Sequence, residues 1–133
     1  MKFKYQNHGD VLRPVIPVVL SYGGKSLDHE VLVDSGSDRC FFDAEILIAL
    51  GITGQAGRFN DIFGVGGSKS SSYYHPIMIK VGDIAYNIEA GFVPLLGGGL
   101  VSYGFAGQKG FFDKFTVKFD LSKNEIEVKE VKN

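Results

Sequence analysis

The sequence predicts an all-β domain, and three observations support that prediction. The 133 residues include 18 glycines, 11 phenylalanines and 6 tyrosines but no tryptophan, which suits short strands joined by tight turns. Runs of β-branched and aromatic residues recur between glycine-containing segments. The length, with 44% hydrophobic and 22% charged residues, fits a single globular domain over residues 1–133.

The first predicted element is a hairpin of two β-branched runs. Residues 14–21 read PVIPVVLS, the turn is YGGKSL, and the second run, HEVLVD, ends at Asp34. A short helix is expected over residues 44–50, with Asp43 as its N-terminal cap. Gly51 marks its C-terminal end, where glycine tolerates a left-handed backbone.

The second half of the chain repeats this kind of pattern. Residues 60–79 are expected to form a long hairpin, and its tip, Gly64 to Ser70, is too rich in glycine and serine to pack and should move. From Pro76 the order of strand, glycine turn, strand and loop restarts. Residues 76–94 therefore echo residues 17–35 and indicate a weak internal duplication.

The C-terminal part is expected to contain a second short helix and two closing strands. The segment QKGFFDKF, residues 108–115, suits the helix despite Gly110. TVKFD and EIEVKEV then read as strands about an SKN turn. No linker interrupts the chain, so no domain boundary is predicted.

Charge and composition argue against several classes of partner. A net charge of -1 gives no basic face for nucleic acid or for an acidic membrane. The first residues lack the apolar core of a signal peptide, which favours a cytoplasmic protein. No phosphate-binding or dinucleotide-binding glycine pattern is complete, so no cofactor is expected.

Cysteine and histidine usage argues against metal and nucleophilic chemistry. The only cysteine, Cys40, has no partner for an internal disulfide and is expected to be an inert buried thiol. His8, His29 and His75 are not spaced as zinc ligands and belong to no Ser-His or Cys-His motif. No metal is expected, and the histidines are expected at the surface.

The segment VLVDSGSDRCFF, residues 31–42, carries the chemistry. An apolar strand delivers Asp34 into a turn in which Ser35 and Gly36 are small enough to bring backbone amides close to the carboxylate. Taken alone, the tripeptide also fits an ordinary Asx turn. The residues around it therefore decide between the two interpretations.

Those residues resemble the active-site loop of retroviral and retrotransposon aspartic proteases. The loop has an apolar pair, Asp-[Ser/Thr]-Gly, a small residue and often an acid, as Leu32 to Asp38 have here. FGVGGS, residues 63–68, is similar to the flap of that family. GFAGQKGFFDKF, residues 104–115, is similar to its apolar-apolar-glycine strand and terminal helix, although Gln108 and Gly110 depart from the usual pattern.

The resemblance implies a retropepsin-like closed barrel with one or two short helices, a single lobe that dimerises. It implies that Asp34 is catalytic, that Ser35 bonds across the dimer axis and that Asp38 holds the substrate backbone. The remaining implied roles belong to the flap and to the walls of the cleft. These residues are Val65, Gly66, Gly67, Phe105 and Ala106.

One Asp-Ser-Gly loop per chain indicates a homodimer, and the resemblance implies that this dimer acts on extended polypeptides. Two carboxylates that share a proton can serve as general base and general acid together, which one carboxylate cannot do in one step. Such a pair requires acidic to weakly acidic solution. The hydroxyl of Ser37 is expected to donate to Asp34, and the terminal strands, including Glu125 to Val131, are expected in the dimer interface.

Two other functions remain open from the sequence. The chain could be a catalytically silent dimerisation or peptide-binding module that keeps the fold. It could also be a β-domain of a larger assembly that uses the glycine-rich hairpin as a binding arm. The intact Asp34 loop argues against the first, and a monomeric state would favour the second.

Overall fold

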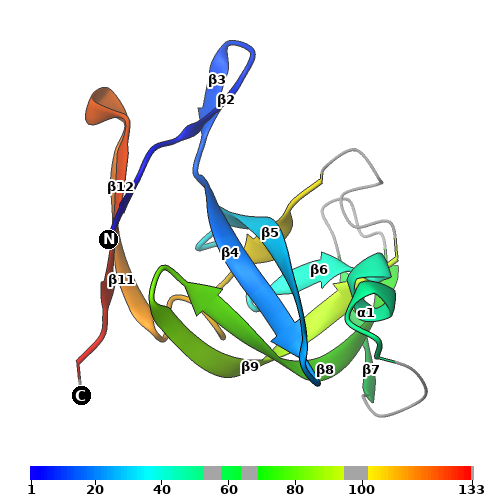
Figure 1. Ribbon diagram of the computed structural model, residues 1–133. Helices are drawn as coiled ribbons and strands as arrows, with labels where there is room; N and C mark the ends of the chain where they lie inside the picture. Colours follow the sequence, from blue (N-terminus) through cyan, green and yellow to red (C-terminus); the bar gives the residue numbers. More distant parts are fainter. Residues whose placement is uncertain (53–57, 64–68, 95–101, 133) are drawn as a thin grey trace.

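The computed structural model describes residues 1–52, 58–63, 69–94 and 102–132. All but two of its regular elements are β-strands, as the composition predicts (Figure 1). In chain order the elements are β1 (Lys2–Phe3), β2 (Gln6–His8), β3 (Val11–Arg13), β4 (Val15–Tyr22), β5 (Lys25–Val33), β6 (Phe41–Asp43), α1 (Glu45–Ala49), β7 (Arg58–Phe63), β8 (Lys69–Val81), β9 (Ile84–Val93), β10 (Gly104–Ala106), β11 (Phe115–Asp120), η3 (Leu121–Lys123) and β12 (Glu125–Glu130).

Six strands close into a barrel. Their order is β4-β5-β10-β6-β9-β8, and an additional pairing of β4 with β8 joins the two ends. β7 extends the sheet beyond β8. Closure leaves no free edge within the barrel and fixes every strand against two neighbours. The predicted all-β closed barrel is therefore confirmed.

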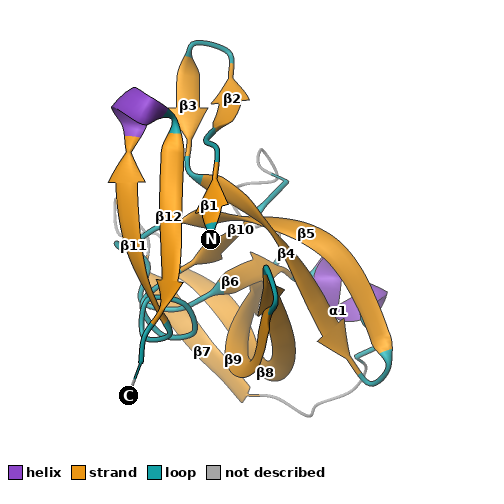
Figure 2. Ribbon diagram, turned by 60° about the vertical axis from the view of Figure 1, so that its left-hand side comes forward, coloured by secondary structure: helices purple, strands orange, loops and turns teal. Residues whose placement is uncertain are grey.

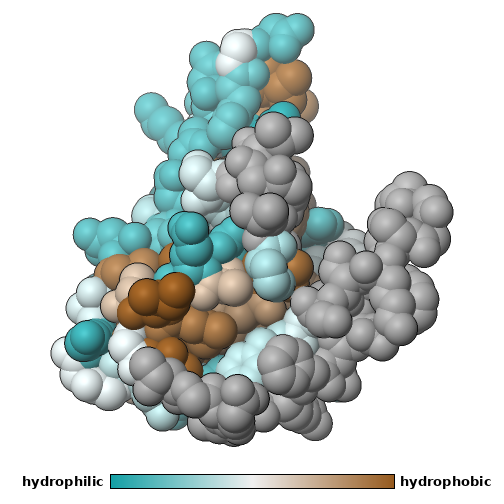
Figure 3. Space-filling model, turned by 90° about the vertical axis from the view of Figure 1, so that its right-hand side faces the viewer, coloured by the Kyte–Doolittle hydropathy of each residue, from teal (hydrophilic) through white to brown (hydrophobic). Residues whose placement is uncertain are grey.

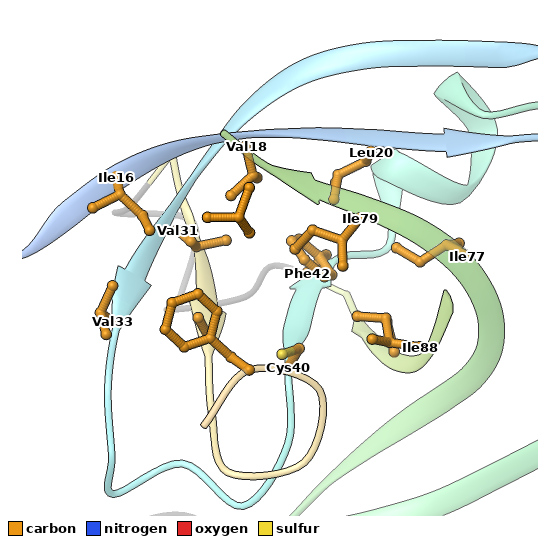
Figure 4. Close-up of a cluster of buried hydrophobic side chains, with 14 of the residues drawn as sticks. Ile16, Val18, Leu20, Val31, Val33, Cys40, Phe42, Ile77, Ile79 and Ile88 are labelled. Carbon is orange, nitrogen blue, oxygen red and sulfur yellow. The ribbon is translucent and has the colours of Figure 1, made fainter. Parts of the chain in front are cut away.

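Inward-facing side chains fill this barrel (Figure 4). Alternate residues of β4 and β5 point to its interior, and inward-facing residues of β8, which pairs with β4, join them there. Aliphatic and aromatic side chains of this kind each contribute roughly 1.5–3 kcal/mol when they leave water. The fully buried members include Ile16, Leu20, Val31, Phe42, Ile79 and Phe92.

The barrel has an internal twofold pattern, which agrees with the duplication suggested by the sequence. Leu20 pairs with Ile79 between β4 and β8, and Phe105 pairs with Phe41 between β10 and β6. β5 runs parallel to β10, just as β9 runs parallel to β6. Asp34 and Val93 are separated by the same number of residues as Leu20 and Ile79, so they occupy equivalent positions in the two repeats. The second repeat therefore has a valine where the first has Asp34.

A small sheet and a hairpin lie beside the barrel (Figure 2). β12 is the central strand of a three-stranded sheet with the order β1-β12-β11, and β2 pairs with β3. β11 pairs with β12 along its whole length, whereas β1 pairs only with Ile126 and Glu127 on the other edge of β12. The expected contribution of Glu125 to Val131 to a dimer interface stays a prediction.

The first predicted helix is present and the second is absent. Glu45 begins α1, and Gly51 after the helix has φ +72. The cap position is held by Ala44 rather than by Asp43 as predicted, although Asp43 Oδ1 accepts the Glu45 amide at 2.9 Å from one residue further back. The segment 108–115, in contrast, forms turns. Gly110 has φ +103, which no helix accommodates, and its amide donates to Asp113 Oδ1 at 3.0 Å. The prediction of a helix there was wrong because Gly110 interrupts it.

The surface that carries α1 is partly apolar (Figure 3). Ile48 is 78% exposed on this helix, whereas Ile46 and Leu47 pack against the core. Within the described residues, no helix is long and apolar enough to cross a membrane.

Candidate active site

Strand β5 positions Asp34. Val31 and Val33 point into the core, so the alternation of the strand places Leu32 and Asp34 on the opposite face. The Val33 amide donates to Pro14 O at 2.8 Å, and the Asp34 amide donates to Ala106 O at 2.9 Å. Backbone bonds on both sides therefore hold the end of β5, and Asp34 is half-buried there.

The turn after Asp34 holds one oxygen of its carboxylate. The Gly36 amide donates to Asp34 Oδ1 at 2.9 Å, and the Ser37 amide donates to Asp34 O at 3.1 Å. A Cβ on Gly36 would lie 3.2 Å from Oδ1, which is tight. Among the described residues nothing hydrogen-bonds Asp34 Oδ2. This carboxylate is thus fixed in place yet free to bind water or a second carboxyl group.

Ser37 does not support Asp34 in the expected way. Its hydroxyl donates to Arg39 O at 2.8 Å rather than to the Asp34 carboxylate. A hydroxyl has only one proton to donate. The expectation that Ser37 sets the ionisation of Asp34 was therefore wrong, and its side chain instead shapes the second half of the loop.

Gln108 and Lys109, just after β10, form hydrogen bonds along the Asp34 loop; we call this pair the strap. The Gln108 amide donates to Ser37 O at 2.8 Å, and the Lys109 amide donates to Asp38 O at 2.9 Å. The Gln108 side chain adds a bond from Nε2 to Ser35 O at 3.1 Å. Ser35 itself is exposed, as a role at a dimer axis would require. Sequence reasoning treated Gln108 only as a departure from the family pattern and missed this role.

Gly107 allows the strap to lie close against the backbone of the Asp34 loop. A Cβ at this position would lie 2.2 Å from Arg39 O and 2.5 Å from Ser37 O. Both contacts are with backbone atoms and are shorter than any real Cβ contact. The glycine after the apolar pair of β10 is therefore required by the packing of this loop.

An apolar wall continues from Asp34 across three strands. Phe105 pairs with both Leu32 and Phe41, so the three side chains share the face on which Asp34 lies. All three are half-buried, and the Phe41 ring lies 6.4 Å from the ring of Tyr74. The sequence identified Phe105 but not Leu32, Phe41 or Tyr74, whose pairing comes from distant strands.

Not every predicted cleft residue lies on this wall. Ala106 is fully buried in the core, and only its carbonyl oxygen reaches the loop, where it accepts the Asp34 amide. It was wrongly predicted to contact substrate, because β10 alternates and turns Ala106 inward. Asp38 is exposed on the loop. Residues 64–68 of the tip predicted to move, which include Val65, Gly66 and Gly67, lie outside the described residues. Lys69 and Ser70 belong to β8 and pair with β7.

Two titratable side chains outside the Asp34 loop, Cys40 and His75, are buried. Cys40 is buried as predicted, and desolvation raises its pKa to about 11, which disfavours the reactive thiolate. His75, in contrast to the prediction of surface histidines, is only 2% exposed and lies against the rings of Tyr22 and Tyr73. Among the described residues no group of His, Cys, Asp and Glu could hold a metal ion.

The partly buried His29 leads to a prediction about stability. Burial lowers the pKa of His29 from its usual value of 6.5, while Glu30 and Asp43 oppose that shift. As the pH falls below 6.5, the unfolded chain therefore takes up a proton that the folded chain resists. His29→Gln should reduce the loss of stability between pH 6.5 and pH 5, measured as urea midpoints.

The same comparison at pH 8 and above supplies the control, because His29 is neutral there in both folded and unfolded chains. The urea midpoints of wild type and His29→Gln should then differ by the same amount at pH 8 and pH 9. An equal loss of stability on acidification in both proteins would rule out His29 as its source.

Comparisons with known proteins bear on the fold. No family model matches the sequence, and no curated protein matches it. Among solved structures, the chain is similar to the EIAV protease complexed with the inhibitor HBY-793, with a TM-score of 0.54 and 18% sequence identity. The match covers 77% of this chain and 88% of the other. This likeness, with the closed barrel and the one α-helix of the described residues, shows that the chain has a retropepsin-like fold.

Proposed function

We propose that two copies of this chain form an aspartic endopeptidase that cleaves extended polypeptides. The observation that carries the proposal is the state of Asp34. It ends a buried strand, one oxygen is held by the Gly36 amide, and the other has no partner among the described residues. A carboxylate in this position can accept a proton from water or hold one for a leaving group.

The need for two copies follows from the internal repeat. The position equivalent to Asp34 in the second repeat is Val93, which is 8% exposed and carries no acid. Each copy therefore supplies one carboxylate. A dimer in which the two Asp34 loops meet would bring the pair together, and Ser35, exposed at the turn, would face the partner loop.

The reaction then needs no cofactor. One Asp34 carboxylate would take a proton from water as the water attacks the peptide carbonyl carbon. The carboxyl group of the other copy would donate its proton to the carbonyl oxygen, giving a tetrahedral intermediate. As the C–N bond breaks, the first Asp34 would give the proton it took from water to the leaving nitrogen, and the second would take back a proton from a hydroxyl of the intermediate. The apolar wall of Leu32, Phe41 and Phe105 favours apolar side chains next to the cleaved bond.

Dimerisation gives the test of this proposal. Cleavage of a fluorogenic apolar peptide near pH 5 should rise faster than in proportion to protein concentration and become proportional once the dimer saturates. Sedimentation at the same concentrations should show the monomer converting to dimer over the same range. The catalytically silent alternative predicts the dimer without cleavage.

An activity per molecule that stays constant while sedimentation shows only monomer would contradict the two-copy site. A monomer at every concentration without cleavage would instead favour the β-domain of a larger assembly.

A further inference from the structure

Arg39 is held rigidly at the end of the Asp34 loop. Its carbonyl oxygen accepts the Ser37 hydroxyl at 2.8 Å, and its backbone forms a parallel bridge with Lys109. β6 begins two residues later at Phe41. The side chain of Arg39 therefore projects from a backbone that the loop and the strap both fix.

The guanidinium group rests on an aromatic ring. Its central carbon lies 5.3 Å from the centroid of the Tyr74 ring, which is close enough for a cation–π interaction. Tyr74 is buried, and its ring also neighbours Phe41. In the part of the chain that the structure describes, no carboxylate forms an ion pair with Arg39. A half-buried cation is thus held in one orientation without an anion.

This cation lies beside the apolar wall at a distance that suits an extended peptide. Alternation along the chain puts Arg39 on the same face as Phe41, next to the end of the wall where Asp34 lies. β5 and β6 are separated by β10 alone, so Asp34 and Arg39 arise from backbones roughly 10 Å apart. An extended peptide spans that distance in about three residues.

We propose that Arg39 selects an acidic side chain in the substrate, two or three residues from the cleaved bond. The substrate class is then an extended peptide with apolar residues at the cut and an aspartate or glutamate nearby. The stacked guanidinium would donate paired hydrogen bonds to that carboxylate. This inference rests on the proposed function, because it assigns a preference to the same cleft.

The test compares fluorogenic peptides that share an apolar cleavage site and carry Glu, Gln or Lys at each position up to three residues from it. Wild type should cleave the best Glu peptide with a kcat/KM roughly 5- to 30-fold above its Gln counterpart. Added salt should reduce the ratio. Arg39→Gln should bring it close to one, and Arg39→Glu should favour the Lys peptide instead.

Lys118→Glu is the matched control, because it changes the net charge as Arg39→Glu does but lies on β11, where its side chain is exposed. It should keep the preference of the wild type. Equal cleavage of Glu and Gln peptides by wild type would overturn the inference while leaving the endopeptidase intact. A preference for the Glu peptide that persists in Arg39→Glu would likewise overturn the inference and leave the endopeptidase intact.

A binding measurement separates failure of the inference from failure of the enzyme. Fluorescence anisotropy with labelled Glu and Gln peptides uses the Asp34→Asn variant, in which no cleavage is expected. Tighter binding of the Glu peptide, lost in the double variant with Arg39→Gln, would support the role of Arg39 even without turnover. Equal affinities, or no binding of either peptide, would overturn it.

Discussion

The Asp34→Asn variant is expected to fold and dimerise like the wild type but to cleave peptides at least about 1,000-fold more slowly. The amide has nearly the shape of the carboxylate, and its oxygen can still accept the Gly36 amide as Asp34 Oδ1 does at 2.9 Å. It can neither take a proton from water nor share one with its twin. The loss should therefore appear in kcat, with thermal unfolding and sedimentation unchanged.

A mixing experiment makes this test specific for a shared site. If subunits exchange freely and a mixed dimer is inactive, equal amounts of wild type and Asp34→Asn leave about one quarter of the dimers active. Activity per wild-type chain should then fall to about half. Asp83→Asn is the matched control, because it makes the same chemical change at an exposed position in the turn between β8 and β9, where no role in catalysis or substrate binding is assigned. Undiminished cleavage by Asp34→Asn would falsify the assigned mechanism.

Local sequence was enough to predict the features that depend on neighbouring residues. The hairpin of β4 and β5 follows from β-branched runs around Gly23 and Gly24, both of which have positive φ. α1 follows from Asp43 and Gly51 at its ends. The position of Asp34 follows from an apolar strand running into a Ser-Gly turn. Each of these depends on residues only a few places apart.

Features that depend on distant contacts were missed or wrongly predicted. Gly110 interrupts the predicted helix because its backbone takes a positive φ beside Cys40, whose sulfur would lie 3.0 Å from an added Cβ. Ser37 donates to Arg39 because the strap from Gln108 and Lys109 fixes the loop in that shape. The wall beside Asp34 joins β5, β10 and β6, and no local pattern shows that these strands are neighbours.

Gly107→Ala is expected to destabilise the protein by about 3–5 kcal/mol, which lies at the upper end for single substitutions. The added Cβ would fall 2.2 Å from Arg39 O and 2.5 Å from Ser37 O, so the loop or β10 must move. The movement would break the backbone bonds from Gln108 and Lys109 that hold the Asp34 loop. Thermal unfolding should show a midpoint lower by roughly 10–25 °C.

Two further variants separate this steric effect from other causes. Gly23→Ala adds a Cβ with nothing within 4 Å but at φ +58, so it should cost only the roughly 1–2 kcal/mol of a left-handed backbone. Gln108→Ala removes the side-chain bond to Ser35 O and keeps the backbone strap, so it should lose about 0.5–1.5 kcal/mol. A Gly107→Ala protein as stable as Gly23→Ala would show that the strap can shift without cost. The close approach at Gly107 would then not be what holds Asp34 in place.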